Sequence, residues 1–152
     1  MDPTAFDRGR LAACAAELVA HARELAARGW VPATSGNFSV RLSDELLAIT
    51  ASGADKGRLC EADVIAVDLA GRPVVAGRQP SAEVALHAAL YRRPGVGAVL
   101  HTHSHAQTVA GLLHAAEGRV RLRGYELLKA LRGQHTHEAT VDVPVVPNAQ
   151  DT

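Results

Sequence analysis

Apolar residues recur along the chain with two different periods, which predict a helix followed by a run of strands. Between residues 11 and 26, apolar side chains repeat at steps of three and four, which places them on one face of a helix. Asp2 and Pro3 favour the start of this helix, and Gly29 favours its end. The segments FSVRL, LLAIT and VIAVDL follow between residues 38 and 69, separated by turn-forming residues. This pattern predicts an antiparallel meander.

The second half of the chain alternates helical and extended patterns. Ser81 is suited to cap a helix that runs through Leu90, and residues 96–102 follow it as a buried strand. Helices are expected at residues 106–115 and 125–131, and the closing run ATVDVPVV is expected to form a strand. Residues 1–152 are therefore expected to form a single α/β domain in which helices cover a mixed sheet in three layers.

Composition narrows the classes of protein and partner. The 152 residues suit about one domain, and 47% hydrophobic but only 3% aromatic residues predict a core of Leu, Val and Ala. The 16 basic and 16 acidic residues cancel and form no basic stripe, which argues against a nucleic-acid partner. No apolar run approaches the roughly 20 residues of a membrane span, so no membrane partner is expected. Asp2 and Asp7 stand where a signal peptide would be basic, and Cys14 and Cys60 are too few for a disulfide framework, so a cytoplasmic location is expected.

Two histidines at the polar end of the strand AVLHTHS are the first candidates for chemistry. Alternate side chains of a strand project from one face, so His101 and His103 can converge on one metal ion. A pair of this kind, taken alone, is also compatible with a purely structural role. His105 continues the alternation, but SHAQ is typical of a turn into a helix, which would carry that ring away from the strand face. A second pair, His135 and His137, lies in a polar loop and is expected to be structural.

Small polar residues gather in two loops, TSGNFS at residues 34–39 and ITASGADKG at residues 49–57. Their backbone amides can form a concave nest for a phosphate, helped by the hydroxyls of Ser35, Ser52 and Ser81, although the same residues are typical of ordinary turns. Lys56 beside them is expected to be solvated. His87, within the second helix, is expected to be a packing or surface residue.

Two glutamates stand at helix starts, where the helix dipole favours a negative charge. Glu83 precedes the strand of the histidine pair and can also approach a metal held by His101 and His103. Glu126 begins YELLKAL, and a carboxylate beside a bound substrate can shuttle a proton if its environment tunes its pKa. A plain role at the helix start is the alternative for both.

The order and spacing of five segments carry a resemblance that covers nearly the whole chain. TSGNFSVR, ITASGADKG, QPSAEVALHAALY, GAVLHTHS and GYELLKAL resemble the class II aldolase and adducin family. SGN, PSxE and HxH are shared with the sugar-phosphate aldolases of that family, whereas YELLKAL points to its dehydratases. The resemblance implies a three-layer α/β/α fold with a mostly antiparallel sheet, a small sugar-phosphate substrate, and a homotetramer with the active site between subunits.

The resemblance also implies roles for individual residues. His101 and His103 would ligate one zinc ion per subunit, although imidazoles also suit iron, cobalt and nickel. Glu83 would occupy the place of the acidic residue beside the metal in the aldolases and is, with Glu126, a candidate catalytic residue. Glu126 would be the general acid/base that takes the proton next to the ketone and returns it to the departing hydroxyl. The residues around the substrate phosphate would be Asn37, Ser52, Gly53 and Ser81.

One departure from the family pattern leaves alternatives open. The family supplies a third zinc-ligating histidine from a GHG-type segment downstream, which these 152 residues lack, so a C-terminally truncated member is expected. Glu83, His105 or His137 could replace that ligand, although nothing in the spacing demands it. A class II sugar-phosphate aldolase and a non-catalytic metal-binding subunit remain as alternative functions, because the zinc ligands alone do not separate the reactions.

Overall fold

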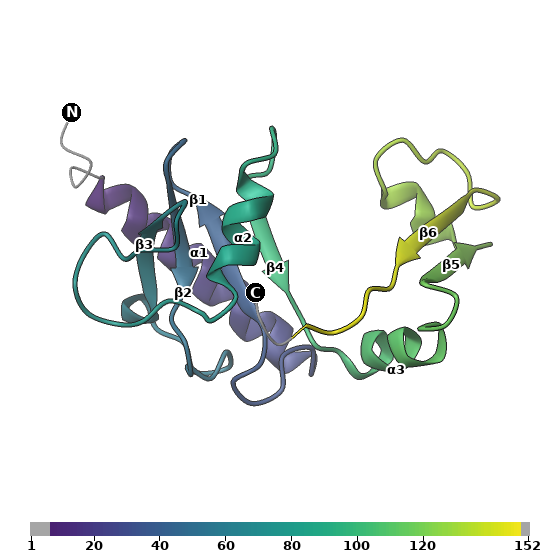
Figure 1. Cartoon of the computed structure of the whole chain (residues 1–152), viewed down its shortest axis with the longest axis horizontal. Coiled ribbons are helices and arrows are strands. Elements are labelled where there is room, and N and C mark those ends of the chain that lie inside the picture. The colour runs from purple at the N-terminus through teal and green to yellow at the C-terminus, as the bar shows by residue number, and fades with distance from the viewer. Residues whose placement is uncertain (1–6, 150–152) are drawn as a thin grey trace. The chain divides into compact units, whose positions relative to one another are not determined.

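The computed structural model describes residues 7–149 as two compact units, residues 7–104 and residues 105–149 (Figure 1). The first unit contains α1 (Arg8–Ala27), β1 (Asn37–Arg41), β2 (Leu46–Thr50), η1 (Glu61–Asp63), β3 (Val64–Asp68), α2 (Val84–Tyr91) and β4 (Ala98–His101). The second contains α3 (His105–Leu113), β5 (Arg119–Arg123), η2 (Glu126–Ala130) and β6 (Thr140–Pro144).

The first unit is built on a sheet with the strand order β3-β2-β1-β4. Each of its strand pairs is antiparallel, with Ser39 on β1 opposite Ile49 on β2 and Val99 on β4. The predicted meander is therefore confirmed, and so is the mostly antiparallel character of the sheet. The connection through α2 returns the chain as β4 beside β1, which makes β1 an inner strand and β4 an edge.

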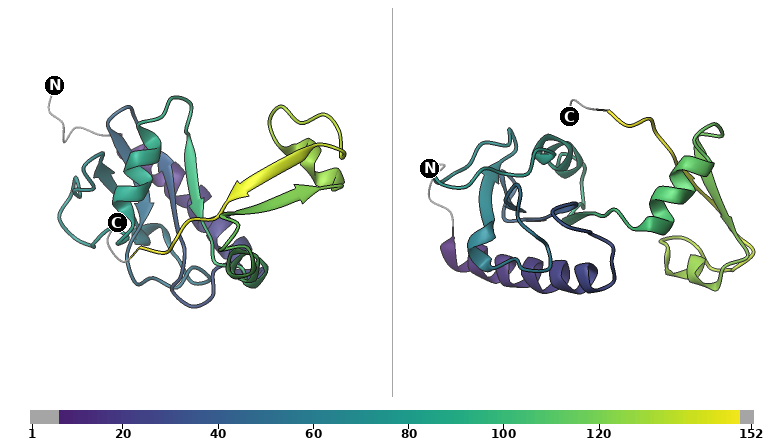
Figure 2. Two further views of the ribbon diagram at one scale, coloured as in Figure 1. Left: turned by 45° about the vertical axis from the view of Figure 1, so that its right-hand side comes forward. Right: turned by 90° about the horizontal axis from the view of Figure 1, so that it is seen from below.

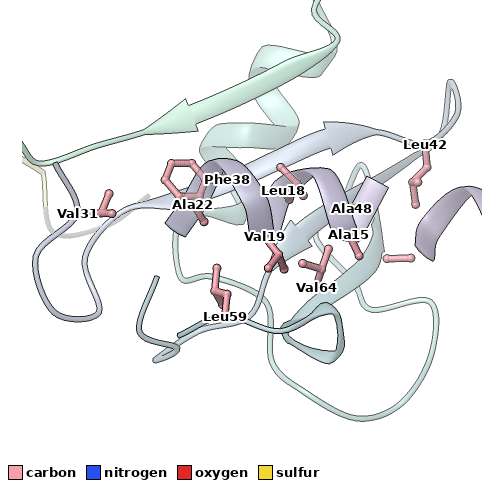
Figure 3. Packing of buried hydrophobic residues seen from close by; sticks show 11 residues of the cluster. Ala15, Leu18, Val19, Ala22, Val31, Phe38, Leu42, Ala48, Leu59 and Val64 are labelled. Atoms are coloured by element: carbon pink, nitrogen blue, oxygen red, sulfur yellow. The ribbon is translucent and has the colours of Figure 1, made fainter. Parts of the chain in front are cut away.

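Two helices cover opposite faces of this sheet, which gives the predicted three layers (Figures 1 and 2). A core cluster that includes Leu18, Val19 and Phe38 lies between α1 and the sheet (Figure 3). A smaller cluster with Ile49 and Tyr91 lies on the face covered by α2. Burial of each such side chain contributes roughly 1.5–3 kcal/mol, so both helices are held mainly by their apolar faces.

Helix boundaries in the first unit follow local capping. Asp7 caps α1, because its Oδ1 accepts hydrogen bonds from the amides of Gly9 (2.8 Å) and Arg10 (3.1 Å). The expected start at Asp2 and Pro3 lies outside the described residues. Ser81 was expected to cap the second helix, but α2 begins later, with Glu83 as its N-cap. The Ser81 hydroxyl instead accepts from the Glu83 amide at 3.3 Å in the turn before the helix.

The second unit combines a short helix with a two-stranded antiparallel ladder between β5 and β6. β5 was not predicted, because RVRLR alternates three arginines with only two apolar residues. On its polar face, Arg121 forms a bidentate ion pair with Asp142 of β6, with Nε donating to Oδ1 at 2.8 Å and Nη2 to Oδ2 at 2.9 Å. YELLKAL forms a 3-10 helix over five residues rather than the expected α-helix. Gly124 and Gly133 on its two sides adopt positive φ angles of 77° and 82°, at which a helix cannot continue.

No helix within residues 7–149 is both long enough and apolar enough to cross a bilayer.

Candidate active site

The two histidines after the apolar strand lie next to each other. His101 is the last residue of β4, and its ring centroid is 4.5 Å from that of His103, with the ring planes tilted by 43°. The His103 amide donates to the carbonyl of Trp30 at 2.7 Å, which fixes the chain just beyond the strand. The structure thus brings together the two imidazoles that the HxH spacing singles out.

Glu83 joins this pair from the start of α2. One of its oxygens, Oε2, accepts hydrogen bonds from His101 Nδ1 at 2.5 Å and from Asn37 Nδ2 at 2.7 Å. Partial burial acts to raise the pKa of Glu83, but the hydrogen bond from Asn37 and the neighbouring charge and hydrogen bond of His101 bring the pKa below its ordinary value. Glu83 is therefore an ionised acceptor, which leaves Nε2 of His101 as the ring nitrogen suited to a metal.

A buried polar chain continues from Asn37 into the sheet. Asn37 Oδ1 lies 2.6 Å from His87 Nε2, while Ser39 Oγ lies 2.6 Å from His87 Nδ1 and 2.9 Å from the Tyr91 hydroxyl. Burial and the nearby charge of His101 lower the pKa of His87 to about 4, so this ring is neutral at pH 7. The expectation of a packing residue missed these contacts. The sequence did hold one sign of them, because Glu83 and His87 are four positions apart, which places both side chains on one helix face.

A pocket of about 400 Å³ opens beside the Glu83 carboxylate, and all of its lining belongs to the first unit. The four residues expected around a phosphate lie on its wall together with Glu83 and His103. Gly53 supports the turn there with a φ of +74°, and the Ser52 amide is held by the carbonyl of Gln79 at 3.0 Å. The lining residues are Thr34, Ser35, Gly36, Asn37, Ala51, Ser52, Gly53, Lys56, Ser81, Ala82, Glu83 and His103.

Lys56 is buried, which corrects the expectation of a solvated side chain. It is only 2% exposed, and its ammonium donates to the carbonyls of Thr34 (2.9 Å) and Ala54 (2.7 Å). Burial lowers the pKa of Lys56, partly offset by the charge of Asp55. Because the two carbonyls belong to different loops, Lys56 ties together the two loops that line the pocket.

Gly36 explains why the first of these loops needs a glycine at its centre. Its φ is +73°, and an added Cβ would lie 2.6 Å from Val31 Cγ1 and 2.7 Å from the His101 carbonyl oxygen. Only a residue without a side chain therefore lets this loop pass so close to the end of β4.

The donor types at His101 and His103 fit a zinc ion, but they supply only two imidazoles. Within residues 7–149, no group of three or more His, Cys, Asp and Glu side chains is arranged to hold a metal. His105 begins α3, and His137 Nδ1 lies 3.1 Å from Glu126 Oε1. Neither is part of such a group in the described chain.

Glu126 belongs to the second unit. It begins η2, and its carboxylate contacts Lys129 Nζ at 2.5 Å and His137 at 3.1 Å. Its side chain is 69% exposed, so these ion pairs leave it open to solvent.

Comparison with known proteins agrees with the motifs. Residues 16–152 match the model of the class II aldolase and adducin N-terminal domain. The chain belongs to the class II aldolase and adducin family. It is 55% identical to a methylthioribulose-1-phosphate dehydratase of Xanthomonas campestris pv. campestris (strain 8004), over 98% of this chain and 69% of the relative. It is also 55% identical to a protein of the same name from Stenotrophomonas maltophilia (strain K279a), over 99% of this chain and 72% of the relative. The family expected from the sequence is thus confirmed, and relatives with the name of a dehydratase support the interpretation of YELLKAL.

Solved structures of the family share the fold. An L-fuculose-1-phosphate aldolase from Thermus thermophilus matches with a TM-score of 0.67 and 32% identity, over 95% of this chain and 67% of that one. Another L-fuculose 1-phosphate aldolase matches with a TM-score of 0.62 and 31% identity, over 72% of this chain and 50% of that one.

Proposed function

We propose that this class II aldolase family member catalyses the zinc-dependent dehydration of 5-methylthioribulose 1-phosphate to 2,3-diketo-5-methylthiopentyl 1-phosphate, a step of methionine salvage. The observation that carries the proposal is the meeting of Glu83, His103 and two small-residue loops around one pocket, with His101 hydrogen-bonded to Glu83 and beside His103. The relatives named methylthioribulose-1-phosphate dehydratase support the choice of substrate.

His101 and His103 would hold the zinc ion, with Glu83 orienting His101 through its Nδ1 hydrogen bond. When bound, zinc supplies a Lewis acid for the substrate's oxygens. The phosphate would lie against the loops of Ser52, Gly53 and Ser81, whose small polar residues suit an anion better than an apolar ligand. Asn37 is assigned to the same end of the pocket, although its amide also serves Glu83 and His87.

Glu126 is assigned as the general acid/base. Its carboxylate takes the proton from the carbon next to the ketone and returns it to the hydroxyl that departs from the following carbon. One water molecule is eliminated, and the resulting enol becomes the second ketone of the product. Glu83 would keep its hydrogen bond to His101 and so hold that ring in place. A cytoplasmic homotetramer with this site between subunits completes the proposal.

The direct test is to incubate the purified chain with zinc and methylthioribulose 1-phosphate and to follow the product by mass and NMR. The expected product has lost one water and carries two adjacent ketones. Glu126→Gln is expected to slow the reaction by about 10²–10⁴-fold. Glu138→Gln, which changes another exposed glutamate of the same unit, is the matched control and should leave the rate within about two-fold.

Two other outcomes would each favour a different function. The likeness to the fuculose-phosphate aldolases supports a carbon–carbon bond cleavage, and aldehyde fragments without the diketone would establish it. The two-histidine donor set supports a non-catalytic metal-binding subunit. Zinc binding that His103→Ala abolishes, together with no turnover of the sugar phosphate, would establish that role.

A further inference from the structure

The hydrogen-bonded chain behind the pocket has only one consistent direction. Asn37 donates its Nδ2 group to Glu83 Oε2 at 2.7 Å, so its Oδ1 is the atom that faces His87. Since an amide oxygen only accepts, His87 Nε2 must carry the proton of the 2.6 Å contact. A neutral imidazole has one donor and one acceptor, so His87 Nδ1 accepts from the Ser39 hydroxyl at 2.6 Å.

At the far end of this series of hydrogen bonds, Ser39 and Tyr91 also have partners. Because the Ser39 hydrogen points to His87, its oxygen accepts from the Tyr91 hydroxyl at 2.9 Å. Ser39 and His87 are fully buried and Tyr91 is nearly so. Buried groups of this kind cannot exchange partners with water, so the direction set at Glu83 reaches Tyr91 without an alternative.

We propose that His87 is a positioning residue of this site: held by Ser39, it fixes the amide of Asn37, and through Asn37 it holds the Glu83–His101 pair with Nε2 of His101 turned to the metal. This inference rests on the proposed function only where it invokes the metal. His87 itself is fully buried and is not part of the pocket wall. Its effect passes through Asn37, whose oxygen would be left without a donor if the imidazole were removed.

His87 and His101 are expected to be opposite tautomers, and this difference can be measured. His87 carries its proton on Nε2, whereas His101 carries it on Nδ1, where it donates to Glu83. Nitrogen NMR of the ¹⁵N-labelled histidine rings in the metal-free 152-residue chain distinguishes these forms directly. We expect His87 and His101 to show opposite tautomers at pH 7.

Three variants then separate positioning from general structural damage. His87→Leu removes the donor to Asn37, and we expect His101 to lose its single tautomer and the chain's affinity for zinc to fall about ten-fold. His87→Gln retains a side-chain amide that can donate to Asn37, and it should restore both readouts to within about three-fold. His21→Leu, the same exchange at an exposed site of α1, should change neither. Thermal unfolding of each variant verifies that it is folded.

Ser39→Ala is a smaller change that keeps the imidazole in place. Without the serine hydrogen, His87 Nδ1 has lost its donor, so we expect a mixture of His87 tautomers and a drop of about three-fold in zinc affinity. This variant provides the test if His87→Leu does not fold.

The outcomes are distinct. The inference is overturned if His87 carries its proton on Nδ1 in the parent chain, or if folded His87→Leu leaves the His101 ring and the zinc affinity unchanged. If the parent chain binds no zinc while His87→Leu still alters the His101 tautomer, the proposed function fails and the positioning role stands.

Discussion

The two compact units of the chain differ in what holds them together. In residues 7–104 apolar side chains fill both sides of a four-stranded sheet, and polar groups such as His87 and Lys56 are buried with partners. In residues 105–149 Leu128 is the one buried apolar side chain described, while Leu112, Leu127 and Val146 are exposed. There a backbone ladder and surface ion pairs such as Arg121–Asp142 hold the strands. A site whose geometry depends on burial is therefore built in the first unit, whereas the acid assigned to proton transfer lies in an exposed element of the second.

Core truncation should show the largest difference between the units. Leu47→Ala removes a fully buried side chain of β2, and we expect a loss of about 2–5 kcal/mol in the free energy of unfolding. Leu127→Ala makes the same change at a residue that is 82% exposed and should cost under about 0.5 kcal/mol. Urea titration of both variants measures the contrast. A comparable loss at Leu127 would mean that this side chain is covered in solution, for example by another copy of the chain.

Glycine replacement separates a crowded turn from an open one. Gly36→Ala combines a positive φ with two contacts below 3 Å and should cost about 2–5 kcal/mol. Gly133→Ala in the second unit has a similar φ of +82° but nothing within 4 Å, so only the backbone cost of about 1–2 kcal/mol is expected. Both variants are measured by thermal and urea unfolding. An equal loss of stability in Gly36→Ala and Gly133→Ala would show that the loop around Gly36 can move away from His101.

Lysine removal compares a buried ammonium with an exposed one. Lys56→Met leaves the carbonyls of Thr34 and Ala54 without their donor, which should cost about 1–3 kcal/mol and loosen both pocket loops. Lys129→Met removes only an exposed ion pair with Glu126 and should change stability by less than about 1 kcal/mol. Urea midpoints and amide hydrogen exchange at residues 34–37 and 52–57 measure the two effects. Unchanged exchange in Lys56→Met would contradict its role as a tie between the loops.

Acidification should weaken the first unit through His87. The folded pKa of His87 is about 4, below its ordinary value of 6.5, so the unfolded chain takes up the proton first as the pH falls. The stability associated with the neutral ring is therefore complete above about pH 6.5 and is lost progressively down to about pH 4. The urea midpoint of the parent should fall more steeply over this range than that of His87→Gln, which has no ionisable ring. Parallel pH profiles of the two proteins would contradict the buried neutral state.

Prediction from the sequence succeeded where local pattern and burial agree. The short apolar runs FSVRL, LLAIT and VIAVDL predicted β1, β2 and β3, because such runs between turn-forming residues are typical of strands that are covered on both faces. The HxH and SGN motifs singled out side chains that the structure brings together. The charged strand β5 was missed, because Arg119, Arg121 and Arg123 occupy a solvent face and leave a weak apolar signal.

The polar interior of the site was not visible in the sequence, because its partners are distant in the chain. His87 contacts Asn37, which lies 50 positions away, and Lys56 reaches the carbonyl of Thr34 over 22 positions. Backbone carbonyls carry no sequence signal at all, so the burial of Lys56 could not be inferred from residue types. The roles assigned to Glu126 and to the phosphate loops come from the family resemblance and stay predictions.

Strand β1 carries the apolar core on one side and the polar chain on the other at single-residue spacing. Phe38 packs toward α1, while its neighbours Asn37 and Ser39 contact His87 of α2. A slip of one residue in pairing would exchange these two sets, because side chains alternate across a strand. A misaligned chain could still collapse and bury apolar surface, yet it would lack the proposed zinc site. During refolding, only molecules with the correct register of β1 would therefore take zinc from a metal-sensitive dye. The dye signal would distinguish them from compact but misfolded molecules.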